Sequence, residues 1–175
     1  MAGPGERAQD GIMVRPARTG DGPGYARVWT DAGRNFVGID PATLQLPEPD
    51  GLVAWFEGSL AQPRPPGSLW LVAEAGGELA GFVHGTVEPP HPDARFQLLR
   101  DLGRARLVVG VLAVAEAARR SGVGTALMTA IEAAARERGA EVVTLDTNLR
   151  SPLSVPFYEN RMGYQRRGVI FRKEL

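Results

Sequence analysis

A glycine-rich segment in the second half of the chain has the residues needed to bind an anion. Arg119, Gly122 and Gly124 stand at the start of a helical pattern, after a continuous apolar run at 107–114 and a polar connector. At a helix start the unpaired backbone N–H groups and the positive end of the helix dipole point in the same direction. We therefore predict that a phosphorylated ligand binds here.

The segment does not have the residues of a P-loop. That motif requires a lysine and then Ser or Thr after its last glycine, but Gly124 is followed by Thr125 and Ala126. The only lysine is Lys173, close to the end of the sequence. The same count argues against an internal Schiff-base lysine.

A dinucleotide-binding loop fits the segment in part. A helix follows Gly122 and Gly124, and Asp146 ends the next strand-like run at about the distance expected for a ribose-binding acid. However, Leu127 occupies the third glycine position, and the connector 115–121 separates the strand from the glycines. A dinucleotide-binding protein therefore stays open as an alternative.

Composition excludes several other classes of site and partner. The chain contains no cysteine, which rules out disulfides, thiolate metal sites and a cysteine nucleophile. Its two histidines, His84 and His91, have no clustered carboxylates beside them, so we predict no catalytic metal. Basic and acidic residues balance at 20 each, so no overall field favours nucleic acid or an anionic membrane. No apolar run reaches the roughly 18 residues of a membrane span, and a cytoplasmic location is the default expectation.

The periodicity of apolar residues predicts a single α/β domain. We expect residues 1–11 to form a flexible lead and residues 12–175 to form the domain. Two strands separated by Gly76-Gly77-Glu78 predict an antiparallel hairpin, and a strand, a helix and a further strand predict a later βαβ unit. The expected architecture is an α+β mixed sheet of about six or seven strands flanked by four helices. Strands are expected at 12–17, 69–75, 79–87, 106–114 and 141–146, with further β-type sequence at 164–175, and helices at 21–36, 52–60, 124–138 and 151–162.

Two segments of the sequence, in the order in which they occur, resemble motifs of a known family. The pattern Arg119-x-x-Gly122-x-Gly124 after a long apolar strand resembles the acetyl-coenzyme A motif of the GNAT N-acetyltransferase superfamily, Arg/Gln-x-x-Gly-x-Gly/Ala. The segment from Ser151 to Tyr164 resembles the family's later helix, in which an Asn-rich start leads to Phe/Leu-Tyr and then to Gly-Phe. The resemblance is sharp over residues 107–164 and nearly absent before residue 69.

The resemblance implies a GNAT-like fold, acetyl-CoA as co-substrate and no metal. It implies that the amides of residues 119–124, with Thr125, hold the pyrophosphate, and that the arginines add charge beside it. It further implies that residues 112–114 bond to the pantetheine and that one amide there polarises the thioester carbonyl. The coenzyme-binding residues implied are Leu112, Ala113, Val114, Arg119, Arg120, Ser121, Gly122, Val123, Gly124, Thr125, Asn148 and Ser151.

The family's position for the general acid that protonates the leaving thiolate corresponds to Tyr158. An attacking ammonium must also lose a proton, and the sequence does not single out the base. Glu88 and Glu116 are candidates, as are the two histidines, although each of these residues also has an ordinary structural explanation.

The sequence departs from the family pattern at three places. Glu116 stands where the family often has proline, and Ser151 replaces an asparagine. The stretch from Tyr158 to Tyr164 is one residue longer than usual.

The function that the resemblance implies is acetyl transfer from acetyl-CoA to a primary amine of a small molecule or peptide, by direct attack. A non-catalytic acyl-CoA sensor or interaction module is the alternative that would use the same pocket. A homodimer is an expectation at the level of the family only. The residues do not identify the acceptor.

Overall fold

The computed structural model describes residues 11–173 and divides into two compact units, Met1–Leu145 and Asp146–Leu175. The expected flexible lead at 1–11 lies outside the described residues, apart from Gly11.

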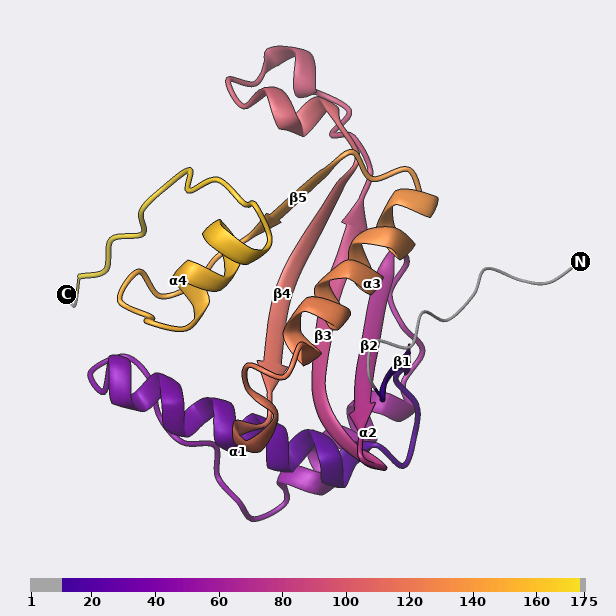
Figure 1. The fold of residues 1–175 in the computed structure, drawn as a ribbon. Coiled ribbons are helices and arrows are strands. Elements are labelled where there is room, and N and C mark those ends of the chain that lie inside the picture. Colours follow the sequence, from indigo (N-terminus) through magenta and orange to yellow (C-terminus); the bar gives the residue numbers. More distant parts are fainter. Residues whose placement is uncertain (1–10, 174–175) are drawn as a thin grey trace, which may run out of the picture. The chain divides into compact units, whose positions relative to one another are not determined.

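The first unit is built on a five-stranded sheet in the order β1-β2-β3-β4-β5 (Figure 1). The first four strands are antiparallel to their neighbours, and β5 is parallel to β4. The sheet confirms the expected antiparallel strands leading into a βαβ unit. The strands are β1 Ile12–Pro16, β2 Ser68–Ala75, β3 Glu78–Glu88, β4 Arg106–Val114 and β5 Val142–Leu145.

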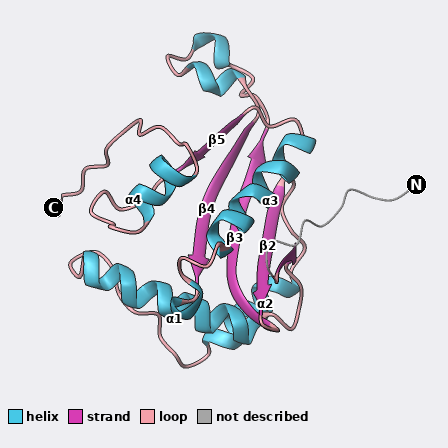
Figure 2. Ribbon diagram, viewed as in Figure 1, coloured by secondary structure: helices cyan, strands magenta, loops and turns pink. Residues whose placement is uncertain are grey.

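Helices of the first unit cover both faces of this sheet (Figure 2). On one face, α1 (Gly22–Ile39) and α2 (Leu52–Ala61) enclose an aromatic core. The crossover helix α3 (Val123–Glu137) packs on the other face. Short 3₁₀ turns lie at Ala94–Phe96, Arg100–Gly103 and Glu116–Ala118. The core under α1 and α2 includes Tyr25, Val28, Phe56, Val72, Phe82 and Ala113.

Two glycines of β3 set how closely α3 approaches the sheet. A Cβ built on Gly81 would lie 2.8 Å from the carbonyl oxygen of Ala113 and 3.0 Å from a methyl of Val123. A Cβ built on Gly85 would lie 2.8 Å from Leu107 and 3.1 Å from Ile131. Only glycine fits at this distance, so these two positions determine where α3 packs on the sheet and therefore where its N-terminus lies.

Strand β4 contains a bulge at Gly110. The register with β3 changes from Gly85 opposite Val109 to His84 opposite Val111, which leaves Gly110 as an extra residue. Because one extra residue reverses which face each side chain points to, the alternation changes at this point. Leu107 meets α3 at Gly85, whereas Val111 packs against the core under α1 and α2.

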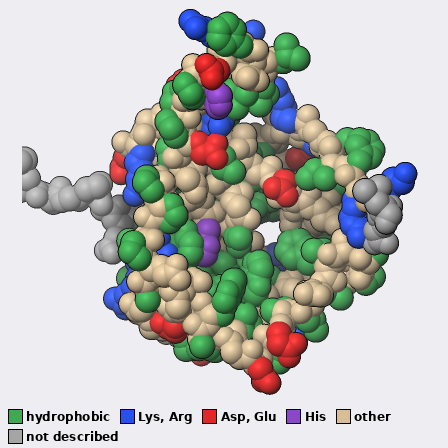
Figure 3. All heavy atoms as spheres, turned by 180° about the vertical axis from the view of Figure 1, so that it is seen from behind, with side chains coloured by type: hydrophobic (Ala, Val, Ile, Leu, Met, Phe, Trp, Pro, Cys, Tyr) green, Lys and Arg blue, Asp and Glu red, His purple; other side chains and the backbone are tan. Residues whose placement is uncertain are grey.

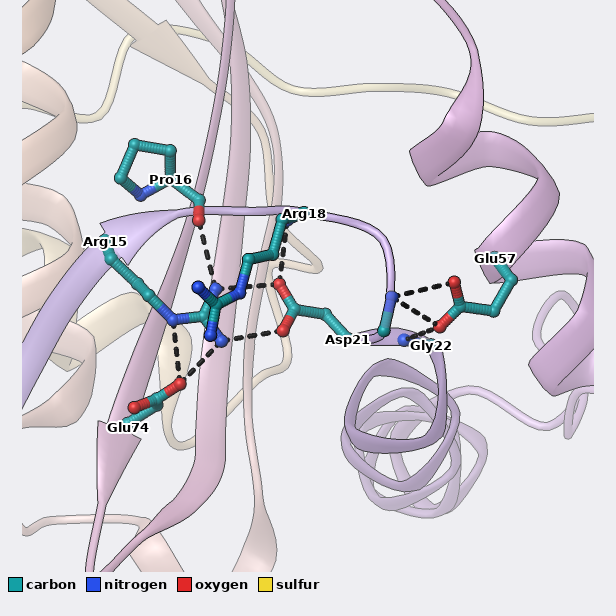
Figure 4. Close-up of polar contacts among 8 residues, drawn as sticks. Arg15, Pro16, Arg18, Asp21, Gly22, Glu57 and Glu74 are labelled. Atoms are coloured by element: carbon teal, nitrogen blue, oxygen red, sulfur yellow. Dashed lines mark hydrogen bonds and ion pairs between the residues drawn. The ribbon is translucent and has the colours of Figure 1, made fainter.

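An ion cluster fixes the chain between β1 and α1 (Figure 4). The guanidinium of Arg15 donates to both carboxylate oxygens of Asp21, at 2.7 and 2.9 Å, and its Nε donates to Glu74 at 2.8 Å. Burial acts to raise the pKa of Asp21, but hydrogen bonds from Arg15 and from the Arg18 N–H outweigh it and hold that pKa below its ordinary value. Glu57 of α2 accepts the N–H of Gly22 at 2.7 Å.

The second unit contains α4 (Ser154–Pro156) followed directly by a π-helix, Phe157–Arg161. The predicted β-type segment at 164–175 forms no strand within its described part, 164–173, so the sheet has five strands rather than six or seven. Propensity alone does not make a strand, because a strand needs a partner edge with which to exchange hydrogen bonds.

Candidate functional site

Strand β4 has one free edge beyond the bulge. Its pairing with β5 runs only from Arg106 opposite Val142 to Val109 opposite Leu145. Beyond that point, residues 110–114 have no partner strand on this side within the described part of the chain. The backbone groups of that stretch are therefore placed to bind an extended ligand in the manner of an added strand.

The connector that follows β4 is held by α1. The carboxylate of Asp31 accepts the N–H of Glu116 at 3.0 Å, and the main-chain carbonyl of Asp31 accepts a guanidinium N–H of Arg119 at 2.9 Å. Sequence reasoning did not find this role of Asp31, because the two partners lie 85 and 88 residues further along the chain. No local pattern in the sequence signals such a contact.

The start of α3 has the geometry of an anion site. Gly122 adopts a left-handed conformation with φ 96°, and Arg120 does so with φ 64°. The N–H of Ala126 makes the first helical hydrogen bond, to the carbonyl of Gly122 at 2.9 Å. The N–H groups of Val123 and Gly124 precede that bond and lie at the positive end of the helix.

Two of the amides expected to bind the anion already donate within the connector. The N–H of Arg119 donates to Glu116 at 3.2 Å, and that of Ser121 donates to Ala118 at 3.5 Å. The side chain of Arg119 is half-buried, whereas that of Arg120 is exposed. The amides best placed for an anion are therefore those of Arg120, Gly122, Val123 and Gly124, with Thr125 in the first turn of α3.

A family model for the acetyltransferase (GNAT) family matches residues 37–164. The match spans β4, its connector and the start of α3. The chain belongs to the GNAT acetyltransferase family. A search of curated proteins found no match.

Several solved structures share the fold of this chain. A transcriptional regulator from Bacillus halodurans C-125 is 22% identical, with a TM-score of 0.67, over 94% of this chain and 99% of that one. An aminoglycoside acetyltransferase from an uncultured soil metagenomic sample is 17% identical, with a TM-score of 0.63, over 95% and 98%. A tetramutant protein from Bacillus halodurans has a TM-score of 0.74 at 19% identity, over 93% and 99%. At these identities the likeness shows the fold alone.

The second unit holds three of the predicted site residues. Ser151 is buried, and its hydroxyl oxygen accepts the N–H of Ser154 at 3.0 Å, which caps the first turn of α4. Helical structure thus begins three residues later than expected at 151. Asn148 lies in the turn before it and accepts the N–H of Arg150 at 2.9 Å. Tyr158 lies in the π-helix, with its ring 5.7 Å from that of Tyr164.

The π-helix explains the longer spacing between Tyr158 and Tyr164. The N–H of Met162 bonds to the carbonyl of Phe157 at 3.0 Å, five residues back, where an α-helix would bond four residues back. Such a turn accommodates one more residue than an α-helical turn. Burial raises the pKa of Tyr158 to about 12, and the charge of Asp146 adds to the rise.

The candidates for the general base lie in different places. Glu88 forms an ion pair at 2.6 Å with Arg106, its cross-strand neighbour, at the end of β4 away from the connector. Glu116 is exposed and directly follows the free edge of β4. His91 is exposed in the loop after β3 and accepts the N–H of Asp93 at 3.1 Å. His84 lies within β3, opposite Val111.

Residues 11–173 contain neither a metal-binding cluster nor a membrane-spanning helix. No group of three or more His, Asp or Glu side chains there has an arrangement that could hold a metal ion. No helix in the same range is long and apolar enough to cross a membrane.

The bulge at Gly110 was not predicted from the sequence, although an isolated glycine inside an apolar strand is a known signal for a bulge.

Proposed function

We propose that this chain transfers an acetyl group from acetyl-CoA to a primary amine of a small molecule or peptide, by direct attack of the amine. One observation carries the proposal: the free edge of β4 at 110–114 leads, through a connector held by α1, into the glycine-rich start of α3. A strand-like binding edge and an anion site thus follow each other in a single stretch of chain.

These features fit the two chemically distinct parts of coenzyme A. The amides of Gly122, Val123 and Gly124 at the start of α3 suit a pyrophosphate, and glycine at 122 lets the backbone approach it closely. The amides of the pantetheine arm suit the free edge at 112–114, where one backbone N–H would also stabilise charge on the thioester oxygen. In the second unit, Asn148 and Ser151 are assigned to the coenzyme from the resemblance alone.

The reaction requires two proton transfers. The amine nitrogen forms a bond to the carbonyl carbon, the carbon–sulfur bond breaks, and the amine loses one proton while the thiolate gains one. Tyr158 is assigned as the donor to sulfur from the family resemblance, and its raised pKa means that the phenol holds a proton at neutral pH. For removal of the amine proton, Glu88, Glu116 and the two histidines are the candidates, and the variants Glu88→Gln and Glu116→Gln test the two carboxylates.

The test is turnover with acetyl-CoA and a panel of amines, followed by thiol release. We expect release that depends on the amine, and an acetylated product by mass spectrometry. Binding of acetyl-CoA without turnover of any amine would contradict the proposal and favour an acyl-CoA sensor. Binding of NADH in place of acetyl-CoA would favour the dinucleotide alternative.

The role of Tyr158 is tested separately. Tyr158→Phe removes only the hydroxyl, so we expect a lower kcat with little change in affinity for acetyl-CoA. Tyr164→Phe is the matched control, since it removes a hydroxyl from the neighbouring ring and should leave kcat unchanged. Equal loss of kcat and affinity in Tyr158→Phe would argue against the acid role.

A further inference from the structure

Three side chains form a stack on the face of the sheet that α1 and α2 cover. The rings of Trp70 on β2 and His84 on β3 lie opposite each other and nearly parallel, with centroids 3.9 Å apart and planes at 10°. The guanidinium carbon of Arg64 lies 3.9 Å from the centre of the Trp70 ring. The Nε2 atom of His84 is 3.0 Å from the hydroxyl of Tyr25.

The stack lies in line with the free edge of β4. Trp70 is paired with His84, and His84 with Val111, so these three residues form one row across β2, β3 and β4. Trp70 and Val111 both pack against the core under α1 and α2. The row ends next to the bulge at Gly110, where the edge proposed to hold the thioester begins.

The guanidinium of Arg64 is available for an anion. Within residues 11–173 it has no carboxylate partner, and its side chain is half-buried against the indole. The segment Pro63-Arg64-Pro65-Pro66 carries it, and three prolines restrict the backbone there. A guanidinium that lies over an aromatic ring can still donate its N–H groups to a carboxylate.

The other polar groups of the stack carry no opposing charge. Burial, reinforced by the charge of Arg64, lowers the pKa of His84 to about 3, so the imidazole is neutral at physiological pH. Burial also raises the pKa of Tyr25, so its hydroxyl keeps its proton. The nearby carboxylate that acts on Tyr25 is Asp21, which is bound by Arg15. The stack is therefore an aromatic surface with a single positive charge at one end.

Figure 3 shows the side of the molecule away from α3, where hydrophobic side chains gather beside a histidine.

The geometry sets a length for the ligand. Adjacent strands lie about 4.8 Å apart, so Trp70 and Val111, two strands apart, are separated by about 10 Å, and the guanidinium carbon of Arg64 lies 3.9 Å from the Trp70 ring on the side away from His84. A carboxylate bound by the guanidinium occupies that last interval, and three residues of an extended peptide, at about 3.3–3.6 Å each, span the rest. We propose that the acceptor is an amine with a carboxylate about three peptide units away, such as a tripeptide with a free C-terminus, bound by Arg64 at the carboxylate and by Trp70 and His84 along its length.

This inference rests on the proposed acetyl transfer. It adds one requirement that the proposed function does not make, namely that the acceptor carries a carboxylate. A polycationic amine would be repelled by Arg64, whereas a peptide acid would be attracted. The test measures acetylation of the tripeptide Ala-Ala-Phe and of its C-terminal amide, both at concentrations well below KM. We expect the acid to exceed the amide in kcat/KM by about tenfold, which corresponds to ~1.4 kcal/mol.

The variants assign that preference to Arg64. Arg64→Gln should lower kcat/KM for the acid to the level of the amide and leave the amide unchanged. The matched control is Arg95→Gln, which removes an arginine that also lies over an aromatic ring, at 4.5 Å from Phe96, in the loop after β3. This control should keep the tenfold preference.

Each outcome decides between the two proposals. Equal kcat/KM for acid and amide in the unsubstituted protein, a comparison that needs no variant to fold, would overturn the inference while the proposed function stands. Acetylation of spermidine with both tripeptides inert would do the same. Absence of turnover with every amine tested would overturn the proposed function and this inference with it.

Discussion

The two glycines that flank α3 allow a sharp test of the coenzyme site. Gly122 precedes the helix with φ 96°, and Gly139 follows it with φ 85°. A Cβ at Gly122 would have a methyl of Ile12 as its nearest neighbour, at an ordinary 3.6 Å, and one at Gly139 would meet nothing within 4 Å. Substitution by alanine therefore introduces backbone strain at both ends of one helix, without a steric clash at either.

The expected magnitude follows from the left-handed conformation. An L-residue in that region is destabilised by about 1–2 kcal/mol, so Gly122→Ala and Gly139→Ala should lower the free energy of unfolding by similar amounts. At Gly122 the loop can relieve the strain by moving away from the geometry that suits a pyrophosphate. Binding must then restore that geometry, which would weaken the affinity for coenzyme A by about fivefold to thirtyfold.

The assay is calorimetric titration of each variant with coenzyme A, alongside chemical denaturation. We expect the two variants to lose similar stability, while only Gly122→Ala loses affinity. Equal affinities in both variants would refute the placement of the pyrophosphate at the start of α3. A loss of affinity in Gly139→Ala alone would refute it more strongly.

Three further predictions concern the elements that hold the site. Gly81→Ala should destabilise the protein by about 1–3 kcal/mol in denaturant melts, because its Cβ would lie 2.8 Å from a backbone oxygen. The control is Gly58→Ala in α2, whose Cβ would meet nothing within 4 Å and which should not destabilise the protein. Equal melts of the two variants would contradict the close packing of α3 on β3. The lowered pKa of Asp21 stabilises the fold above the unfolded pKa of about 3.9, and this stability is lost as pH falls through the folded pKa. Asp21→Asn should therefore flatten the dependence of unfolding free energy on pH between pH 5 and 2, and parallel profiles would count against it. Asp31→Ala should weaken coenzyme A binding in calorimetry because the N–H of Glu116 loses its acceptor, while Asp31→Asn, which keeps a side-chain oxygen, should bind nearly as the parent does.

Local sequence patterns were sufficient to predict the elements around the site. The strand at 106–114 and the helix after Gly124 were found because a buried strand and an amphipathic helix each leave a recognisable pattern of apolar residues in the sequence. The hairpin was found because Gly76 and Gly77 suit a tight turn, and both have positive φ.

Features that depend on distant partners were not predicted. The hydrogen bond from the N–H of Glu116 to the carboxylate of Asp31 joins residues 85 positions apart, so no local pattern in the sequence predicts it. The terminal segment has β-type composition, but its described part has no partner edge and forms no strand. The only sequence signal for the π-helix at 157–161 is the one extra residue between Tyr158 and Tyr164, and hydrophobic periodicity does not reveal it.

The extra residue at Gly110 also bears on how such a chain could change over time. Because Gly110 is the extra residue, deleting it would bring Val109 and Val111 together opposite Gly85 and His84 in a regular ladder. Val111 and every later side chain of the strand would keep the faces that they have now, so the core under α1 and α2 would be preserved. Only the local bend would be lost, at the point where the pairing of β4 with β5 ends, so loss of one residue here would alter the free edge of β4 without altering the core.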